Sequence, residues 1–223
     1  MSGTPRVVPD GPAGRAEAIE VLLAGGIVAI PTDTVYGIAV ALGTPSGIER
    51  LFHVKQRPPD KAIALLLADA DQAAAVADVS VAARALAAAL WPGPLTLVLP
   101  ARPDAPLPAV LRAGGATVGV RLPDHPAPRA LAAAVGPLPT TSANLSGRPD
   151  SFEAGTVTDE LGDGLDLVLD GGRTAGARPS TVVDLTVEPP VIRRVGLIDE
   201  ARIRALLAAA ATEPSTASGT GRD

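Results

Sequence analysis

The sequence predicts an α/β fold built on a mixed sheet. Two observations support this class. Short apolar segments bounded by Gly, Pro and polar residues alternate with Ala-rich amphipathic segments along most of the chain, which is typical of strands alternating with helices. Towards the C-terminal end, three apolar segments follow one another without a helix between them, so some neighbouring strands are expected to be antiparallel.

The expected elements follow from apolar periodicity and from Gly and Pro breaks. Ser46 and Glu49 have the spacing of a capping box and start one helix. Pro58 ends that helix, so Lys55 and Arg57 lie at its end or in the following loop. Helices are expected at 14–24, 46–55, 69–77, 80–90, 126–135 and 200–211. Strands are expected at 27–30, 62–67, 95–99, 117–122, 138–140, 165–169, 181–185 and 191–194.

Composition bounds the class of protein. The chain has 223 residues, 47% of them hydrophobic but only 2% aromatic, so the core must consist of Ala, Val, Leu and Ile. The net charge of −5 argues against a broad basic surface for nucleic acid. The absence of Cys excludes disulfides, cysteine zinc sites and thiol catalysis, and two His residues do not suffice for a histidine metal cluster.

One domain with short ends is expected. Residues 1–12 are rich in Pro and Gly and are predicted to form a flexible lead-in without a signal segment. Residues 13–211 are predicted to form the catalytic domain, and the polar tail 212–223 is predicted to be disordered. No run of about 18 apolar residues is present, so we expect no membrane segment and a cytoplasmic protein.

Several polar clusters border the predicted strands, and each has an ordinary alternative. Lys55, Arg57 and Lys61 could bind a phosphate chain, but three cations in a loop are more often simply solvated. The segment 32–34 could be a turn or the wall of a pocket, and the same holds for the segment 141–144. The order of these clusters at strand ends suits a ligand site of an open α/β sheet.

Arg121 is the most informative single residue. It lies within the apolar strand segment 118–122, where an unpaired buried charge is costly. It must therefore face a charged partner or a cleft, and an anionic ligand such as a carboxylate would suit it. By contrast, His53, His125 and Trp91 are interpreted as structural or surface residues.

Common catalytic signatures are missing. The sequence has no Walker A motif and no convincing dinucleotide-binding glycine motif. It also has no serine nucleophile elbow and no HExxH zinc motif. The residues alone thus predict an α/β protein with an anion pocket and do not name a reaction.

The ordered set of motifs is more specific than any single one. It consists of PTDTVYG at 31–37, KQRPPDK at 55–61, WPGPLT at 91–96, VRLPDHP at 120–126, TSANLSG at 141–147, PSTVVD at 179–184 and RVG at 194–196. Together these segments resemble the YrdC-type L-threonylcarbamoyladenylate synthases, in the short form that lacks a C-terminal extra domain. The resemblance covers about residues 14 to 198.

The resemblance implies a fold, a reaction and a site. The fold is a twisted, open mixed sheet with helices on its faces and a large concave cleft. The reaction makes threonylcarbamoyl-AMP and pyrophosphate from L-threonine, bicarbonate or CO2, and ATP, with Mg2+ held mainly by the phosphates. The product is handed to the tRNA threonylcarbamoyl transferase complex, with weak or no direct tRNA binding by this chain.

The implied site residues fall into two groups and include no protein metal ligand. Lys55 and Arg57 are the catalytic residues. The ATP-binding residues are Lys55, Arg57, Lys61, Thr117, Ser142, Asn144, Ser180 and Arg194, and the threonine-binding residues are Thr32, Thr34, Tyr36 and Arg121.

One position departs from the family pattern, and two other functions stay open. Some members have a histidine that contacts threonine where this chain has Leu66. A carbamoyl-adenylate-forming enzyme is one alternative, although its relatives carry extra zinc-finger regions and this chain has no Cys. An RNA-binding ribosome-maturation protein of the same fold is the other, against which the acidic net charge argues.

Overall fold

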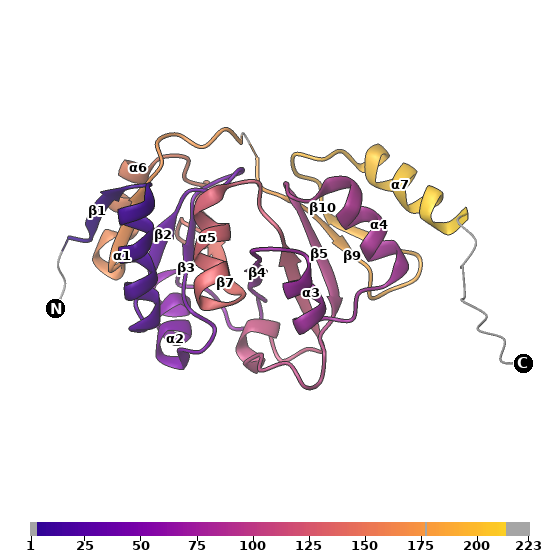
Figure 1. Cartoon of the computed structure of the whole chain (residues 1–223), viewed down its shortest axis with the longest axis horizontal. Coiled ribbons are helices and arrows are strands. Elements are labelled where there is room, and N and C mark those ends of the chain that lie inside the picture. Colours follow the sequence, from indigo (N-terminus) through magenta and orange to yellow (C-terminus); the bar gives the residue numbers. More distant parts are fainter. Residues whose placement is uncertain (1–3, 177, 213–223) are drawn as a thin grey trace, which may run out of the picture.

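A single ten-stranded sheet forms the frame of the molecule. The computed structural model describes residues 4–176 and 178–212. The strand order is β1-β8-β2-β3-β7-β4-β6-β5-β9-β10 (Figure 1). The strands are β1 (Arg6–Pro9), β2 (Val28–Ile30), β3 (Gly37–Ala39), β4 (Ala64–Leu66), β5 (Leu95–Pro100), β6 (Thr117–Arg121), β7 (Leu138–Ser142), β8 (Leu167–Asp170), β9 (Thr181–Asp184) and β10 (Val191–Arg194).

Parallel and antiparallel pairs are mixed within this sheet. β8 pairs in parallel with β1 and β2, and two other parallel pairs are β4 with β6 and β5 with β9. The pairs β2 with β3, β3 with β7, β4 with β7, β5 with β6 and β9 with β10 are antiparallel. The prediction of a mixed sheet is therefore confirmed.

Apolar residues lie on both faces of the sheet. In the segment 27–30, Ile27 and Ala29 belong to one core cluster, whereas Val28 and Ile30 belong to another. Because successive strand side chains point to opposite faces, the two clusters lie on either side of the sheet. The helices are α1 (Pro12–Leu23), α2 (Pro45–Val54), α3 (Asp71–Val76), α4 (Val81–Leu90), α5 (Pro126–Val135), α6 (Ala154–Leu161) and α7 (Glu200–Thr212), with short 3-10 helices at Ala109–Arg112 and Gly162–Gly164.

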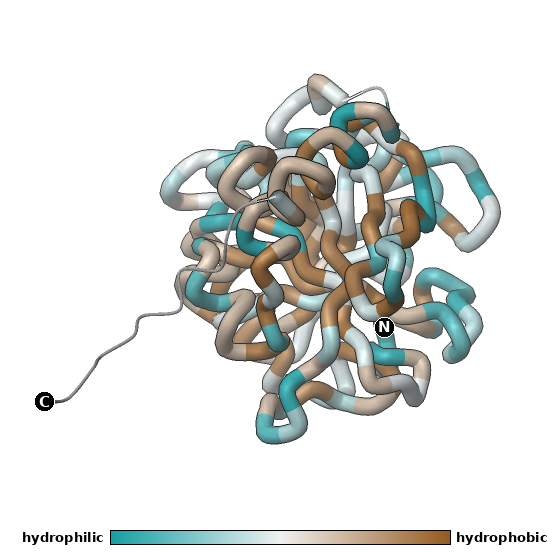
Figure 2. The backbone as a smooth tube through the Cα atoms, turned by 90° about the vertical axis from the view of Figure 1, so that its right-hand side faces the viewer, coloured by the Kyte–Doolittle hydropathy of each residue, from teal (hydrophilic) through white to brown (hydrophobic). Residues whose placement is uncertain are grey.

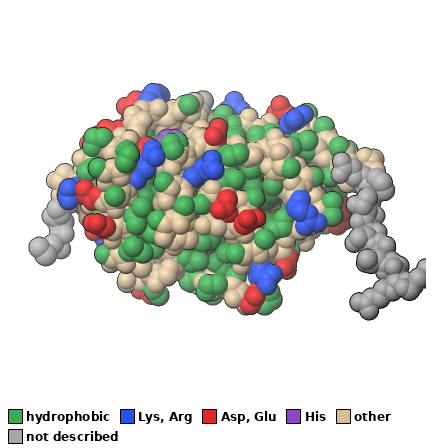
Figure 3. Space-filling model, viewed as in Figure 1, with side chains coloured by type: hydrophobic (Ala, Val, Ile, Leu, Met, Phe, Trp, Pro, Cys, Tyr) green, Lys and Arg blue, Asp and Glu red, His purple; other side chains and the backbone are tan. Residues whose placement is uncertain are grey.

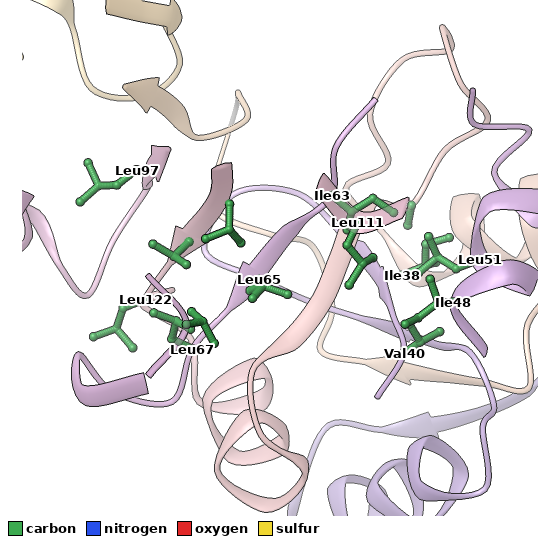
Figure 4. Close-up of a cluster of buried hydrophobic side chains, with 14 of the residues drawn as sticks. Ile38, Val40, Ile48, Leu51, Ile63, Leu65, Leu67, Leu97, Leu111 and Leu122 are labelled. Carbon is green, nitrogen blue, oxygen red and sulfur yellow. The ribbon is translucent and has the colours of Figure 1, made fainter. Parts of the chain in front are cut away.

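The helices divide between the two clusters. Helices α1 and α5 lie side by side over one face and supply Leu22 and Leu131 to the smaller cluster (Figure 1). Helices α2 and α6 supply Leu51 and Val157 to the larger cluster. Figure 4 shows β3, α2 and the β4 region converging there, with Ile38 near Ile48 and Leu51. Figure 2 shows the apolar segments gathered inside and the polar ones in outer loops.

Three local predictions were wrong. The predicted flexible lead-in contains strand β1, which pairs in parallel with β8; its partner is distant in sequence, so local signals could not reveal it. Helix α2 begins at Pro45, after Thr44 as N-cap, and Ser46 is therefore its second residue and cannot cap it. Strand β4 covers only part of the predicted strand 62–67.

Besides β1, one further strand and one further α-helix were not predicted. Strand β3 has only three residues and follows directly on the PTDTVYG motif, so it has no periodic pattern of its own. Helix α6 contains Gly, Thr and Asp, although its buried residues Ala154, Val157 and Leu161 have helical spacing. The predicted disordered tail lies outside the described residues except for Thr212, which ends α7. Within the described part of the chain, no helix is both long and apolar enough to cross a membrane.

Candidate active site

One cavity of about 310 Å3 collects most of the predicted site residues. It opens along the sheet, with walls from the loop between β2 and β3 and from strands β4, β5, β6, β7 and β9. Its predicted members are Thr32, Thr34, Tyr36, Arg57, Thr117, Arg121, Ser142, Ser180 and Arg194. The predicted residues that do not line it are Lys55, Lys61 and Asn144.

Arg121 is held on three sides at one end of the cavity. Its Nη2 forms a 2.5 Å ion pair with Oδ1 of Asp33, and its Nη1 donates to Oγ1 of Thr34 at 2.9 Å. Its Nε donates to the carbonyl of Gly93 at 3.1 Å. Burial lowers the pKa of Arg121, and the Asp33 carboxylate opposes that effect. Arginine has five N–H groups, so one N–H on each terminal nitrogen has no partner among the described residues.

Two of the three predicted threonine-binding hydroxyls form a network beside Arg121, and the third, of Tyr36, has other partners. Oγ1 of Thr32 donates to the carbonyl of Val35 at 2.7 Å and lies 3.0 Å from Oγ1 of Thr34. The Tyr36 hydroxyl donates to Gly172 O at 2.8 Å and accepts from the Gly171 N–H. Burial raises the pKa of Tyr36 to about 12. Its hydroxyl is thus committed to holding the loop that follows β8.

Lys55 lies behind the cavity wall and fastens the segment that follows β7. Its Nζ lies 2.5 Å from the carbonyl and 3.2 Å from the hydroxyl of Ser142. It also contacts the carbonyl of Asn144 and, at 2.6 Å, its Oδ1. Burial and the nearby charge of Arg57 lower the pKa of Lys55 to about 8. Because an ammonium has three donors, these four oxygens occupy it fully.

The turn between Lys55 and Arg57 sends the two cations in different directions. Gln56 has a positive φ of 48°, its N–H bonds to His53 O, and the Arg57 N–H bonds back to Phe52 O. These bonds make a Schellman motif at the end of α2. Arg57 then reaches the cavity, with its Nε and Nη2 bound to the carbonyls of Lys61 and Ala62. The Lys61 side chain is exposed.

A bulge brings Arg194 into the cavity. Ile192 and Arg194 face consecutive residues of β9, so Arg193 is an extra residue in β10. Arg193 pairs with Asp184, whereas Arg194 donates to the carbonyl of Ser180 at 3.0 Å and to its hydroxyl at 3.1 Å. The same hydroxyl lies 2.8 Å from Oγ1 of Thr96. The two adjacent arginines therefore have different partners, Asp184 for Arg193 and Ser180 in the cavity wall for Arg194.

Comparison with known proteins identifies the family to which this cavity belongs. A family profile named Sua5/yciO/yrdC, described as telomere recombination, matches residues 20–196. The chain belongs to this family. The threonylcarbamoyl-AMP synthase of Bacillus subtilis (strain 168) is 36% identical over 194 residues, which are 86% of this chain and 56% of that protein. The threonylcarbamoyl-AMP synthase of Vibrio vulnificus (strain YJ016) is 38% identical over 176 residues, or 77% of this chain and 94% of that protein.

A solved family structure supports the fold directly. The structure of P. abyssi Sua5 complexed with L-threonine matches with a TM-score of 0.84 and 33% identity over 91% of this chain and 60% of that chain. This chain therefore spans little more than half the length of the Bacillus and P. abyssi relatives. The predicted Sua5/YrdC-type fold is confirmed.

Sequence reasoning missed two residues that line the cavity and one that lies beside it. Asp33, which does not line the cavity, was placed in a turn-or-pocket segment but not paired with Arg121, because that pairing joins the loop after β2 to the end of β6. Thr96 supports Ser180, and its position within the WPGPLT motif was its only signal. Asp150 also lines the cavity. In the sequence it was not distinctive, because a single Asp after Pro149 is typical of an ordinary loop or turn. Leu66, at the departing family position, also lines the cavity as an apolar wall.

Few of the described side chains at this site could bind a metal ion. Within residues 4–176 and 178–212, no group of three or more His, Cys, Asp or Glu side chains lies together in a way that could hold a metal ion. Asp150 is the one acidic residue among the described residues that line the cavity. A divalent cation here would therefore take most of its ligands from the substrate and from water.

Proposed function

We propose that this chain is an L-threonylcarbamoyladenylate synthase, which makes threonylcarbamoyl-AMP and pyrophosphate from L-threonine, bicarbonate or CO2, and ATP. The observation that carries this proposal is one cavity with two kinds of anion site. Arg121 is oriented at one end, whereas Arg57 and Arg194 line the rest. The printed names of the family relatives and the threonine complex of the P. abyssi protein support it.

Arg121 is the proposed partner of the threonine carboxylate. One free N–H on each terminal nitrogen suits the two oxygens of a carboxylate. Thr32 and Thr34 lie beside it, and Thr34 accepts one of its bonds. Leu66 offers an apolar surface instead of an imidazole, so we propose that threonine is held here by its carboxylate and by hydroxyl contacts.

The nucleotide is proposed to occupy the part of the cavity bounded by Arg57, Ser142, Ser180 and Arg194. Arg57 and Arg194 each use part of the guanidinium to bind backbone carbonyls, which fixes the planar group for oxyanion binding. Lys55 supports this wall by holding Ser142 and Asn144. Direct contacts of Lys55 and of the exposed Lys61 with the phosphates stay predictions. Contacts of Thr117 and Asn144 with the nucleotide also stay predictions.

The reaction can be written with simple bond changes. The threonine amine attacks CO2, a C–N bond forms, and the amine releases a proton to give a carbamate. A carbamate oxygen then attacks the α-phosphorus of ATP, and the bond to the pyrophosphate oxygen breaks. Arg57 and Arg194 stabilise the phosphate charge and Arg121 aligns the amino acid, so positioning and electrostatics supply most of the rate. A bound Mg2+ would add charge neutralisation at the phosphates.

The proposal extends to partners and location. The product would be handed to a tRNA threonylcarbamoyl transferase complex in the cytoplasm, with weak or no direct binding of tRNA by this chain. Acidic and basic side chains are interspersed on the face shown in Figure 3, and the net charge is −5. Both features support transfer of the product without a broad tRNA-binding surface.

A turnover assay tests the function. Pyrophosphate release should require ATP, L-threonine and bicarbonate together, and mass spectrometry should detect threonylcarbamoyl-AMP. Pyrophosphate release that ignores threonine would contradict the proposal. Release with carbamoyl phosphate in place of threonine and bicarbonate would favour a carbamoyl-adenylate-forming enzyme, and tight salt-sensitive RNA binding without turnover would favour an RNA-binding protein.

A further inference from the structure

Asp150 is an isolated carboxylate in a cavity of cations. It lines the cavity together with Arg57, Arg121 and Arg194, and no other described lining residue is acidic. It is half-buried. Among the residues that the structure describes, no side chain or backbone group forms a hydrogen bond or ion pair with its carboxylate.

The backbone on both sides of Asp150 is firmly held. Before it, Asn144 Nδ2 donates to the carbonyl of Arg148 at 2.5 Å, and the Ser146 hydroxyl donates to Lys55 O at 2.9 Å. After it, the Tyr36 N–H donates to the carbonyl of Ser151 at 2.9 Å. The carboxylate is therefore presented to the cavity by a segment tied to the predicted site motifs.

The charge of Asp150 acts on two cations of the proposed nucleotide site. Burial lowers the pKa of Lys55 and of Arg194, and the charge of Asp150 opposes that shift for both residues. Asp150 is thus near both cations without pairing with either of them. A carboxylate at this place would repel a polyphosphate unless a cation lay between them.

We propose that Asp150 is the protein ligand of the divalent cation that accompanies the triphosphate of the nucleotide. This inference rests on the proposed function. Mg2+ and Mn2+ prefer oxygen ligands, and Mg2+ is commonly held by one or two carboxylates together with substrate phosphates and water. One unpartnered carboxylate beside the proposed phosphate site meets that requirement, and the hydroxyls of Ser142 and Ser180 line the same cavity.

Nucleotide binding with and without metal tests the proposal. The probe is α,β-methylene-ATP, titrated calorimetrically into wild type and Asp150→Asn, once with excess Mg2+ and once with EDTA. With Mg2+, Asp150→Asn should bind about 10-fold more weakly than wild type. With EDTA, it should bind as tightly as wild type or more tightly, because a negative charge beside the phosphates has been removed.

A matched variant and a direct metal signal complete the design. Asp60→Asn removes an exposed carboxylate from the loop after Arg57 that does not line the cavity, and it should behave as wild type in both titrations. With Mn2+ as the metal, water-proton relaxation of the ternary complex should change in Asp150→Asn and not in Asp60→Asn. Thermal unfolding of each variant checks that the fold is retained.

Three outcomes would overturn the inference. Equal weakening with Mg2+ and with EDTA would indicate a hydrogen bond to a nucleotide hydroxyl instead. Weaker threonine binding with unchanged nucleotide binding would indicate pairing with the substrate ammonium. Unchanged binding and relaxation would remove any ligand role for Asp150. If wild type binds no nucleotide under either condition, the proposed function itself fails.

Discussion

The two ends of the cavity differ in how their charges are balanced. At the Arg121 end, the guanidinium is already paired with the Asp33 carboxylate and bound to Thr34. At the other end, Arg57 and Arg194 bind neutral carbonyls, and Asp150 has no partner among the described residues. In the proposed function, the first end would hold the amino acid with a pre-paired guanidinium, whereas the second would bind the phosphates with guanidinium groups that have no acidic partner in the part of the chain that the structure describes. Substitutions at the first end should therefore cost stability as well as activity.

The largest effect is expected for Arg121→Met. The value of kcat/KM for threonine should fall by about 10³-fold, because charge contacts to the substrate are lost. The free energy of unfolding should fall by about 3–5 kcal/mol, because Asp33 is left buried without its partner. Steady-state kinetics and urea unfolding measure the two effects.

A double variant separates these effects. Asp33→Asn combined with Arg121→Met removes the orphaned charge, so it should recover much of the lost stability but none of the lost turnover. Wild-type turnover in Arg121→Met would contradict the assignment of the carboxylate site. Recovery of activity in the double variant would do the same.

At the other end, Arg57→Ala should lower kcat/KM for ATP by about 10²–10³-fold, with a stability loss of only about 1 kcal/mol, because its partners are carbonyls that water can reach. Lys61→Ala is the matched variant from the same loop. Its side chain is exposed and does not line the cavity, so the phosphate contact predicted for Lys61 is expected to contribute less than about 5-fold. Equal losses in both variants would mean that the loop moves Lys61 into the site.

Catalytic efficiency should depend on pH through Lys55, which supports the cavity wall at Ser142. Burial, reinforced by the charge of Arg57, lowers the pKa of Lys55 to about 8. The protonated form holds Ser142 and Asn144, so kcat/KM for ATP should decrease as the pH rises, by about 10-fold between pH 7 and pH 9. Lys55→Met should have low activity without this descending limb. A wild-type profile that is flat up to pH 9 would exclude the role.

The smallest effect is expected at Gln56, outside both ends. Its left-handed backbone at the end of α2 favours glycine. Gln56→Gly should therefore raise the free energy of unfolding by about 0.5 kcal/mol and leave turnover unchanged. Urea midpoints measured alongside wild type check this, and a loss of turnover would show that the Gln56 side chain contacts a substrate.

Much of the site could be predicted from the sequence because its residues come in ordered local motifs. Arg121 could be recognised by its position in an apolar strand, since a buried charge demands a partner. That the partner was Asp33 could not be predicted, because the contact joins the loop after β2 to the end of β6, and their approach depends on the whole sheet. Strand β1 was missed for the same reason, since its pairing with β8 is defined by distant residues.

The role of Lys55 shows a second limit. The family resemblance implied a phosphate ligand, whereas its charge and position alone left a solvated loop open; in the structure its ammonium contacts Ser142 and Asn144. Lys55 still has helical backbone angles at the end of α2, and the Schellman turn at Gln56 then redirects the chain towards Arg57. A Gln in a left-handed conformation gives no clear signal in a sequence. Residue type was thus easier to predict than the direction in which the side chain points.

The bond between Lys55 and Asn144, behind the cavity wall, joins residues that are 89 positions apart, and Arg194 lines the cavity from near the end of the described chain. A fragment that lacks either half of the sheet would hold no complete form of the proposed nucleotide pocket. Nucleotide binding should consequently be coupled to cooperative folding of the whole domain, and saturating ligand would raise its unfolding temperature by mass action. Ligand-induced thermal stabilisation is thus a measure of intact folding in any truncated or recombined form of this chain.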